Sequence, residues 1–339
     1  MKAFEWANPT TLAEVAKLLE PESNEFDEAP QLIAGGQDLL TSMKDYLVRP
    51  TRLVNLKAVR GLDRIASNTS GLRIGALVTL SDLEENQVVR RNFPALAEAA
   101  HSVATPQIRN LGTVGGNLCQ RPRCWYFRLE EAVCLKKGGS ECFAATGESK
   151  YNAILGGGPS YIVHPSDLAP VLVALGATVT IVGASAKRTI PIQEFFTLPS
   201  DGPIRKENIL KAGEIVTEVQ VPSSSLAAKS TYLKFKERES LDFAMSAVAA
   251  AVELSPTKQV KQARIVLGGV APIPWRALKA EKFLEGKSLS AEVLAETAKL
   301  ALDGAKPLDK NAYKVPLTET LVRRALAKVA GVTIRPEEE

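Results

Sequence analysis

The chain has 339 residues, of which 45% are hydrophobic and 24% charged, and its formal net charge is +4, which is the composition of a globular protein of two or three domains. A net charge this small, without a block of Lys and Arg or a basic stripe mixed with aromatic residues, argues against nucleic-acid binding. The sequence starts without the apolar segment of a secretion signal and has no apolar run of membrane-spanning length, so we expect a cytoplasmic protein with no membrane span.

The first predicted elements lead into a pair of glycines. Thr11 and Glu14 have the spacing of a capping box, and apolar residues follow at helical intervals as far as Pro21. A short apolar strand at residues 31–34 then runs into the glycine pair 35–36. A strand, a glycine pair and a helix start can direct backbone N–H groups at a phosphate. A plain tight turn is the alternative interpretation of the pair taken alone.

Two further strands are predicted at residues 52–56 and 72–77. Ser81 or Asp82 is expected to cap a helix after the second strand, and an Ala-rich helix follows over residues 94–104. These elements continue the α/β character of the beginning of the chain.

A second glycine loop lies at residues 112–117. Two such loops could hold the two phosphates of one dinucleotide, because glycine lets the backbone come close to an anion. Neither loop has the Rossmann pattern or the P-loop pattern, so both of those folds are excluded.

All four cysteines of the chain follow directly on this loop, and they are Cys119, Cys124, Cys134 and Cys142. Clustered thiols in a large chain without a secretion signal favour metal ligands over a disulfide framework. Their C-x4-C-x9-C-x7-C spacing suits an iron–sulfur cluster and matches no zinc finger. Structural zinc and inert buried thiols remain the alternatives. Only two histidines occur, so chemistry built on several histidines is not expected.

The rest of the chain predicts more of the same unit and then a separate one. Residues 161–163 predict a strand, and Ser166 or Asp167 is expected to cap a helix over residues 168–175. Alternating strands follow at residues 178–182 and 214–221. After a predicted linker, strands and then helices are expected at 232–236, 247–254, 262–267, 275–284, 291–302 and 317–329, with a frayed tail at 336–339.

Taken together, these motifs resemble the FAD-binding medium subunits of the xanthine dehydrogenase family of molybdenum hydroxylases. The resemblance covers nearly the whole chain and is carried by residues 34–39, 113–117 and 164–170. It implies an α+β chain with a PCMH-type FAD-binding fold (named after p-cresol methylhydroxylase) of two α/β subdomains, followed by a small C-terminal domain of antiparallel sheet plus helical bundle.

The resemblance also implies boundaries and cofactor-binding residues. The first FAD-binding subdomain would span residues 1–57 and the second 58–222, with an iron–sulfur insert at about 118–160, and a C-terminal domain of the CO dehydrogenase flavoprotein type would span 223–335. The residues implied to bind FAD are Ala34, Gly35, Gly36, Gln37, Asp38, Leu39, Gly112, Thr113, Val114, Gly115, Gly116, Asn117, Asp167 and Lys234. The alternatives are a helix N-cap for Asp167 and a solvated strand charge for Lys234.

The cysteines narrow the resemblance to the branch whose flavin subunit also holds a [4Fe–4S] cluster, as in aldehyde oxidoreductases and 4-hydroxybenzoyl-CoA reductases. Relatives in that branch often take the fourth ligand from a later cysteine, where this chain has Ser160. The expected ligands are therefore Cys124, Cys134 and Cys142. The fourth would be Cys119 as a replacement or Ser160 as an oxygen ligand, and a three-cysteine cluster is also open.

The function implied is electron transfer inside a larger complex. A large molybdenum-cofactor subunit would oxidise an aldehyde, a purine or an aromatic substrate, and a small [2Fe–2S] subunit would relay electrons to the FAD of this chain and on to an external acceptor. The direction of flow stays open, because the benzoyl-CoA type of relative works reductively. Two alternatives are a stand-alone PCMH-fold flavin oxidoreductase that uses NADPH and a non-catalytic, zinc-stapled binding module.

Overall fold

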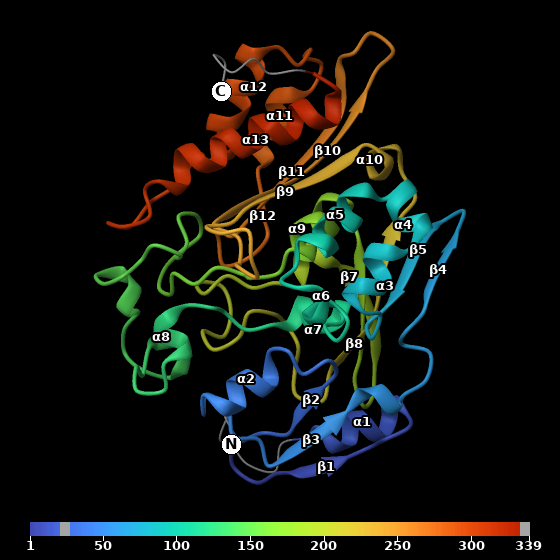
Figure 1. The fold of residues 1–339 in the computed structure, drawn as a ribbon, viewed down its shortest axis with the longest axis vertical. Coiled ribbons are helices and arrows are strands. Elements are labelled where there is room, and N and C mark those ends of the chain that lie inside the picture. The colour runs from blue at the N-terminus through green and yellow to red at the C-terminus, as the bar shows by residue number, and fades with distance from the viewer. Residues whose placement is uncertain (21–27, 333–339) are drawn as a thin grey trace.

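The computed structural model describes residues 1–20 and 28–332, so the predicted frayed tail at 336–339 lies outside the described residues. Within them the strands form three sheets, and these succeed one another along the longest axis of the molecule (Figure 1). The N-terminal sheet lies at one end and the C-terminal sheet and its helices at the other. Each of the three predicted units contains one of the sheets, while their exact boundaries stay predictions.

The N-terminal sheet is small and parallel. Its order is β1 (Glu5–Ala7), β3 (Arg52–Asn55) and β2 (Gln31–Ile33). Helix α1 (Leu12–Leu18) packs on it, and the predicted capping box is confirmed because Glu14 N–H donates to the Thr11 hydroxyl at 3.3 Å and Thr11 N–H to the Glu14 carboxylate at 3.3 Å. The first glycine loop connects β2 with helix α2 (Leu39–Lys44).

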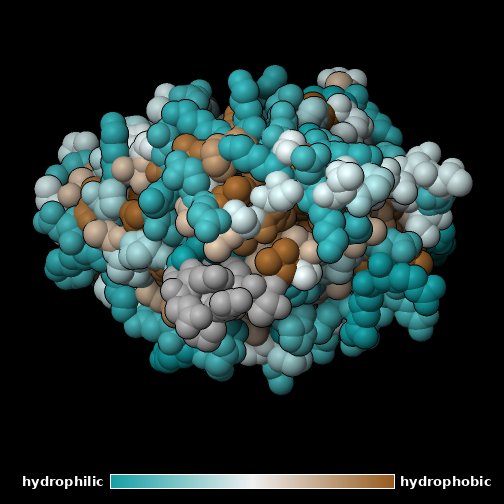
Figure 2. All heavy atoms as spheres, turned by 90° about the horizontal axis from the view of Figure 1, so that it is seen from above, coloured by the Kyte–Doolittle hydropathy of each residue, from teal (hydrophilic) through white to brown (hydrophobic). Residues whose placement is uncertain are grey.

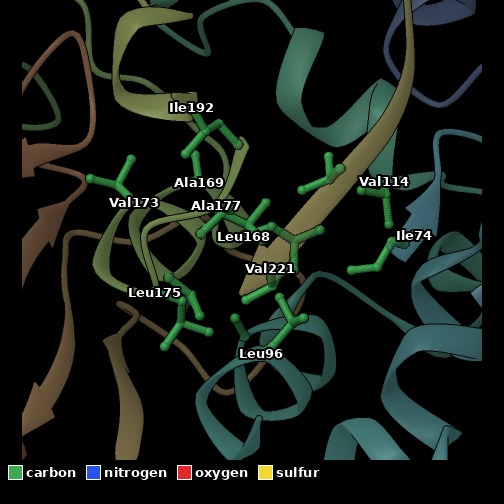
Figure 3. Packing of buried hydrophobic residues seen from close by; sticks show 14 of the residues in the cluster. Ile74, Leu96, Val114, Leu168, Ala169, Val173, Leu175, Ala177, Ile192 and Val221 are labelled. Carbon is green, nitrogen blue, oxygen red and sulfur yellow. The ribbon is translucent and has the colours of Figure 1, made fainter. Parts of the chain in front are cut away.

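The middle sheet is antiparallel and holds the largest core. Its strands, in spatial order, are β4 (Ile65–Asn68), β5 (Gly71–Gly75), β8 (Ile215–Pro222), β6 (Thr178–Val182) and β7 (Lys187–Pro191). The helices between these strands are α3 (Leu80–Glu85), α4 (Gln87–Asn92), α5 (Pro94–Ser102), α6 (Pro106–Arg109), α7 (Val114–Cys119) and α9 (Leu168–Ala174). Every residue of α9 is buried, and its apolar side chains meet those of α5 and β8 in the core (Figure 3).

The C-terminal sheet separates two cores. Its order is β12 (Trp275–Arg276), β11 (Val260–Gly268), β10 (Ser246–Leu254) and β9 (Ser230–Phe235), all antiparallel. In β10 the odd-numbered Ala247, Ala249 and Ala251 join the core of the middle unit, and the even-numbered residues between them face α11 (Leu278–Leu284), α12 (Ala291–Ala301) and α13 (Lys314–Ala330). This follows from the alternation of side chains along a strand, and the small alanines allow close packing on α9.

Between α7 and α9 the chain forms a lobe that projects to one side (Figure 1). It contains the short helix α8 (Trp125–Arg128) and the 3-10 turns η2 (Leu135–Lys137) and η3 (Phe143–Ala145). The end of the lobe is held by the fully buried Lys314 of α13. The Lys314 ammonium donates to the backbone carbonyls of Tyr151 and Asn152, each at 3.1 Å. The C-terminal domain thus fixes the end of the cysteine segment.

Three local predictions are wrong. Residues 161–163 form no strand, because their neighbourhood bonds to remote segments instead: Ala153 N–H donates to Tyr161 O, and His164 N–H to Ala271 O. The N-cap of α3 is Thr79, which forms a capping box with Asp82, so the helix starts two or three residues earlier than expected. The helix predicted from residue 275 begins at residue 278, because Trp275–Arg276 is strand β12, and the predicted linker leads into helix α10 (Ser225–Ala228).

None of the described helices has both the length and the apolar character needed to cross a membrane. Seen from above, the face of the molecule is mostly hydrophilic, with a few hydrophobic residues gathered near its centre (Figure 2).

Candidate functional site

A cavity of about 870 Å³ lies between the two glycine loops. Its walls come from all three units: the loop at 34–39, the loop at 112–117, the segment 205–216 before and within β8, and the β9–β10 hairpin at 241–243. The volume lies in the range of about 300–1,000 Å³ that is usual for cofactor and ligand sites. The sequence-predicted cofactor residues therefore do converge on one concave site.

The two glycine loops touch each other at Gly35. A Cβ atom on this residue would lie 1.9 Å from the carbonyl oxygen of Leu111, far inside any real contact. Gly36 has a φ of +71°, which L side chains rarely adopt. The glycine pair is thus needed for close backbone approach and for its conformation, which is more than a plain tight turn requires.

The second loop uses its backbone N–H groups inside the protein. Thr113 is the N-cap of α7 and accepts a hydrogen bond from Gly116 N–H at 3.2 Å, while Val114 N–H donates to Val78 O and Gly115 N–H to Ala76 O, each at 2.9 Å. A Cβ on Gly115 would come within 2.9 Å of the Ala76 side chain. This loop therefore shapes the cavity by packing closely against the middle sheet.

Most predicted cofactor residues line the cavity. Those that do are Ala34, Gly35, Gly36, Gln37, Asp38, Leu39, Gly112, Thr113, Gly115, Gly116, Asn117, Asp167 and Lys234. Val114 does not: it is fully buried in the core of the middle unit (Figure 3). Its position in the loop motif serves packing.

Asp167, Tyr232 and Lys234 form a buried polar group at the cavity wall. The Asp167 carboxylate accepts from the Lys234 ammonium and from the Tyr232 hydroxyl, each at 2.7 Å, and the lysine also donates to Ser102 O at 3.1 Å. The lysine side chain is 3% exposed, so it is not a solvated charge. Asp167 stands at the N-cap of α9 but makes no capping bond, which Ser166 supplies instead through Ala169 N–H. The solvated-charge interpretation of Lys234 is therefore wrong, whereas Asp167 does occupy the N-cap position of α9 while its side chain binds Lys234 and Tyr232.

Burial shifts the pKa of two groups that lie behind this wall, Tyr232 and His164. Burial and the neighbouring Asp167 charge raise the pKa of Tyr232 well above its ordinary value, so it stays a hydrogen-bond donor. Burial lowers the pKa of His164 to about 3. Its Nδ1 accepts from Ser166 N–H at 3.3 Å, and its ring packs edge-on against Phe196 at 4.7 Å between centroids. The imidazole is therefore neutral at ordinary pH.

The four cysteines do not come together. Cys119, at the end of α7, lines the cavity and packs against the main core, and burial raises the pKa of its thiol to about 12. Cys124 and Cys142 belong to another neighbourhood: the Asn152 side-chain amide lies 3.7 Å from Cys124 Sγ, and Tyr161 N–H donates to Cys142 Sγ at 3.5 Å. Among the described residues no group of three or more His, Cys, Asp or Glu side chains is arranged to hold a single metal ion.

Hydrogen bonds within the lobe link the surroundings of Cys124 and Cys142. The Asn152 amide also donates to Tyr161 O at 3.0 Å, which links the surroundings of Cys124 and Cys142. Cys134 is buried, and its backbone carbonyl accepts a hydrogen bond from Lys137 N–H at 2.8 Å. Ser160 is buried beside Tyr161. Cys124 and Cys142 thus share one part of the lobe, Cys134 and Ser160 are buried elsewhere along the same segment, and Cys119 faces the cavity.

Sequence reasoning missed several lining residues. The segment 205–216 and Phe243, at the tip of the β9–β10 hairpin, line the cavity but belong to no recognisable sequence motif. Only the folding of the chain brings them there. Tyr232 does not line the cavity but holds Asp167 there, and it could have been found because it lies two residues before Lys234 on one strand and so shares its face. Arg121 and Arg123 also line the cavity, although their positions suggested only a basic loop around the thiols.

The three sheets and the cavity between two glycine loops define a PCMH-type FAD-binding fold with an added C-terminal antiparallel domain. Residues 2–224 match the FAD binding domain in molybdopterin dehydrogenase, and residues 230–329 match the CO dehydrogenase flavoprotein C-terminal domain. The chain belongs to this family of FAD-binding medium subunits of molybdopterin-dependent dehydrogenases. The fold class and the family predicted from the sequence are thereby confirmed.

Individual relatives match over almost their full length. The aldehyde oxidoreductase FAD-binding subunit PaoB of Escherichia coli is 35% identical over 97% of this chain and 98% of its own length, and the carbon monoxide dehydrogenase medium chain of Hydrogenophaga pseudoflava is 27% identical over 95% and 96%. Among solved structures, quinoline 2-oxidoreductase from Pseudomonas putida 86 aligns with a TM-score of 0.75 and 25% identity, over 98% of this chain and 99% of that one.

Proposed function

We propose that this chain carries FAD in the cavity between the glycine loops and transfers electrons within a complex that oxidises an aldehyde. FAD, when bound, accepts and releases electrons both singly and in pairs. The observation that carries the proposal is the cavity itself, because thirteen of the fourteen predicted FAD-binding residues line it. The aldehyde class is taken from the relative with 35% identity.

The residues of the chain would divide the work of binding. The first loop would receive the diphosphate, because its glycine pair lets the backbone come close to an anion. The second loop would give the cavity its shape, since most of its N–H groups, those of residues 112 and 114–117, are already bonded within the protein. Lys234 would present a positive charge at the wall, held in place by Asp167, whose other carboxylate oxygen accepts from the Tyr232 hydroxyl.

The lobe would hold a [4Fe–4S] cluster on Cys124, Cys134 and Cys142, with Ser160 as the candidate for a fourth, oxygen ligand. A tetrahedral zinc ion with bonds of about 2.3 Å needs its sulfurs within about 4 Å of one another, and the described thiols are not so arranged. A cluster has ligand sulfurs that stand further apart, and it favours N–H donors such as those of Asn152 and Tyr161 near its sulfurs. Cys119 fits less well, because it faces the cavity.

The partners in this proposal are a large molybdenum-cofactor subunit, a small [2Fe–2S] subunit and an external electron acceptor, and the compartment is the cytoplasm. The test is co-expression with subunits of these two kinds, followed by anaerobic purification, a visible spectrum and a count of iron, molybdenum and zinc. We expect added benzaldehyde to bleach the flavin absorbance of the complex and to leave the isolated chain unchanged. A folded chain that takes up no FAD would refute the proposal, and bleaching of the isolated chain by NADPH would support the stand-alone flavoenzyme instead.

A further inference from the structure

Asp38 belongs to the first glycine loop, yet its carboxylate points into the cysteine lobe. One oxygen accepts a hydrogen bond from the backbone N–H of Arg121 at 2.7 Å. The other lies 2.7 Å from the guanidinium of Arg128 and 3.0 Å from that of Arg123. All three donors come from one stretch of the lobe, residues 121–128.

Arg128 binds helix α2 at two points, at its N-cap residue Asp38 and at Ser42. Its Nη2 binds the Asp38 carboxylate, and its Nη1 donates to the hydroxyl of Ser42, one turn along α2, at 2.8 Å. Its Nε donates to Pro122 O at 2.7 Å and so fixes the start of the lobe as well. The Arg128 side chain is 14% exposed and that of Asp38 17%. A forked guanidinium in this setting gives a defined geometry, unlike an exposed pair of flexible charges.

The charges around Asp38 favour an anion in the cavity in spite of the carboxylate. Two guanidinium groups, of Arg123 and Arg128, face this one carboxylate. Close by, Glu207 is paired with both Arg121, at 2.6 Å, and Lys136, at 2.7 Å. Each acid therefore meets two cations, and the local excess of positive charge can attract a diphosphate.

We propose that the Asp38 carboxylate is a positioning group that couples FAD binding to the conformation of residues 121–128, the segment that leads into the thiols. This inference rests on the proposed function, since FAD must occupy the cavity. Without FAD, the first glycine loop and the lobe hold each other through Asp38. With FAD bound, the loop is fixed, so the lobe loses freedom too, and by linkage an ordered lobe tightens FAD binding.

The first test is limited digestion of the full chain with trypsin, with and without saturating FAD. The bonds after Arg123 and Arg128 are trypsin sites inside the coupled segment, and the exposed turn at Lys258, between β10 and β11, supplies a remote reference site. We expect FAD to slow cleavage after Arg123 and Arg128 about ten-fold relative to Lys258 in the natural chain. In Asp38→Asn the protection should fall below about two-fold although FAD still binds, and in the control Asp45→Asn, an exposed carboxylate after the same helix, it should persist.

The second test is a double-mutant cycle on FAD affinity, measured by quenching of flavin fluorescence. If Asp38 acts through Arg128, then Asp38→Asn and Arg128→Gln should each weaken FAD binding by about ten-fold, and the double variant should weaken it by much less than a hundred-fold, because both changes remove the Asp38–Arg128 ion pair. Additive losses, about a hundred-fold in the double variant, would overturn the inference. The inference would also be overturned if FAD protected Asp38→Asn from trypsin cleavage as strongly as it protects the natural chain.

The two proposals fail in different ways. If the natural chain binds FAD and residues 121–128 gain no protection, the coupling is refuted and the flavin site stands. If the natural chain binds no FAD, the flavin site itself is refuted. Should Asp38→Asn not fold, Arg128→Gln removes the link from the lobe side without changing the glycine loop and decides the question.

Discussion

Replacing Gly35 by Ala should separate the two glycine loops and weaken FAD binding. The added Cβ would lie 1.9 Å from Leu111 O, whereas real Cβ contacts are essentially never shorter than 3.0 Å, so the loops would have to part by at least 1.1 Å. Overpacking of this kind costs about 1–3 kcal/mol. In the empty protein the loops can relax apart, but binding a ligand that both of them contact would require them to close again. The strain should therefore appear in the affinity, as FAD binding about 5- to 150-fold weaker.

The assay is titration of the apoprotein with FAD, followed by flavin fluorescence, together with a thermal unfolding curve to show that the variant is folded. Gly61→Ala is the matched control: a Cβ there meets nothing within 4 Å, and the residue is exposed and outside the cavity lining. Gly61 has a φ of +85°, so we expect the control to lower stability through its backbone while leaving FAD affinity unchanged. A folded Gly35→Ala protein that binds FAD within about two-fold of the natural chain would show that the contact between the loops does not set the flavin site.

Three further changes test the cysteines and the buried histidine. Cys119→Ser should keep both iron and FAD, because this thiol faces the cavity, while Cys124→Ser should lose iron and keep FAD; metal analysis and the visible spectrum distinguish them. Asn152→Leu removes the N–H donor near Cys124 Sγ, so the potential of the cluster should become more negative in a redox titration followed by electron paramagnetic resonance. The pKa of His164 is about 3 in the folded chain and about 6.5 when unfolded. Between these values the unfolded chain binds more protons, so stability should fall on acidification by up to about 1.4 kcal/mol per pH unit, and urea midpoints of His164→Asn at pH 7 and 4.5 should show a smaller fall.

Local rules allowed much of the fold to be predicted from the sequence. The capping box at Thr11 and Glu14 depends on four adjacent residues, and it forms as expected. The alternation in β10 likewise needs only the strand itself. The strand predicted at 161–163 failed because an apolar run with β propensity specifies no partner, and here its neighbours bond to residues 142, 153 and 271.

The site was harder to predict than the fold, for a physical reason. The glycine loops could be located because their chemistry is carried by residue type. The direction in which Cys119 points could not be predicted from the sequence. It depends on the packing of α7 against the middle sheet and not on the spacing of the cysteines. Asp38 shows the same limit: its place in the loop motif suggested a cofactor contact, and only the fold reveals that Arg121 and Arg128 hold its carboxylate.

The position of the cavity gives the cofactor a structural role as well as a redox one. Gly35, Gly112 and Phe243 contribute to its wall from the N-terminal, middle and C-terminal units in turn. A ligand that binds only this assembled arrangement stabilises it by mass action, by about 2.7 kcal/mol at a hundred times its Kd. Because Asp38 and Arg128 extend the same wall into the lobe, the proposed coupling would carry part of that stabilisation to the thiols. The flavin site and the cysteine lobe would then form one cooperative unit, in which each site helps to preorganise the other.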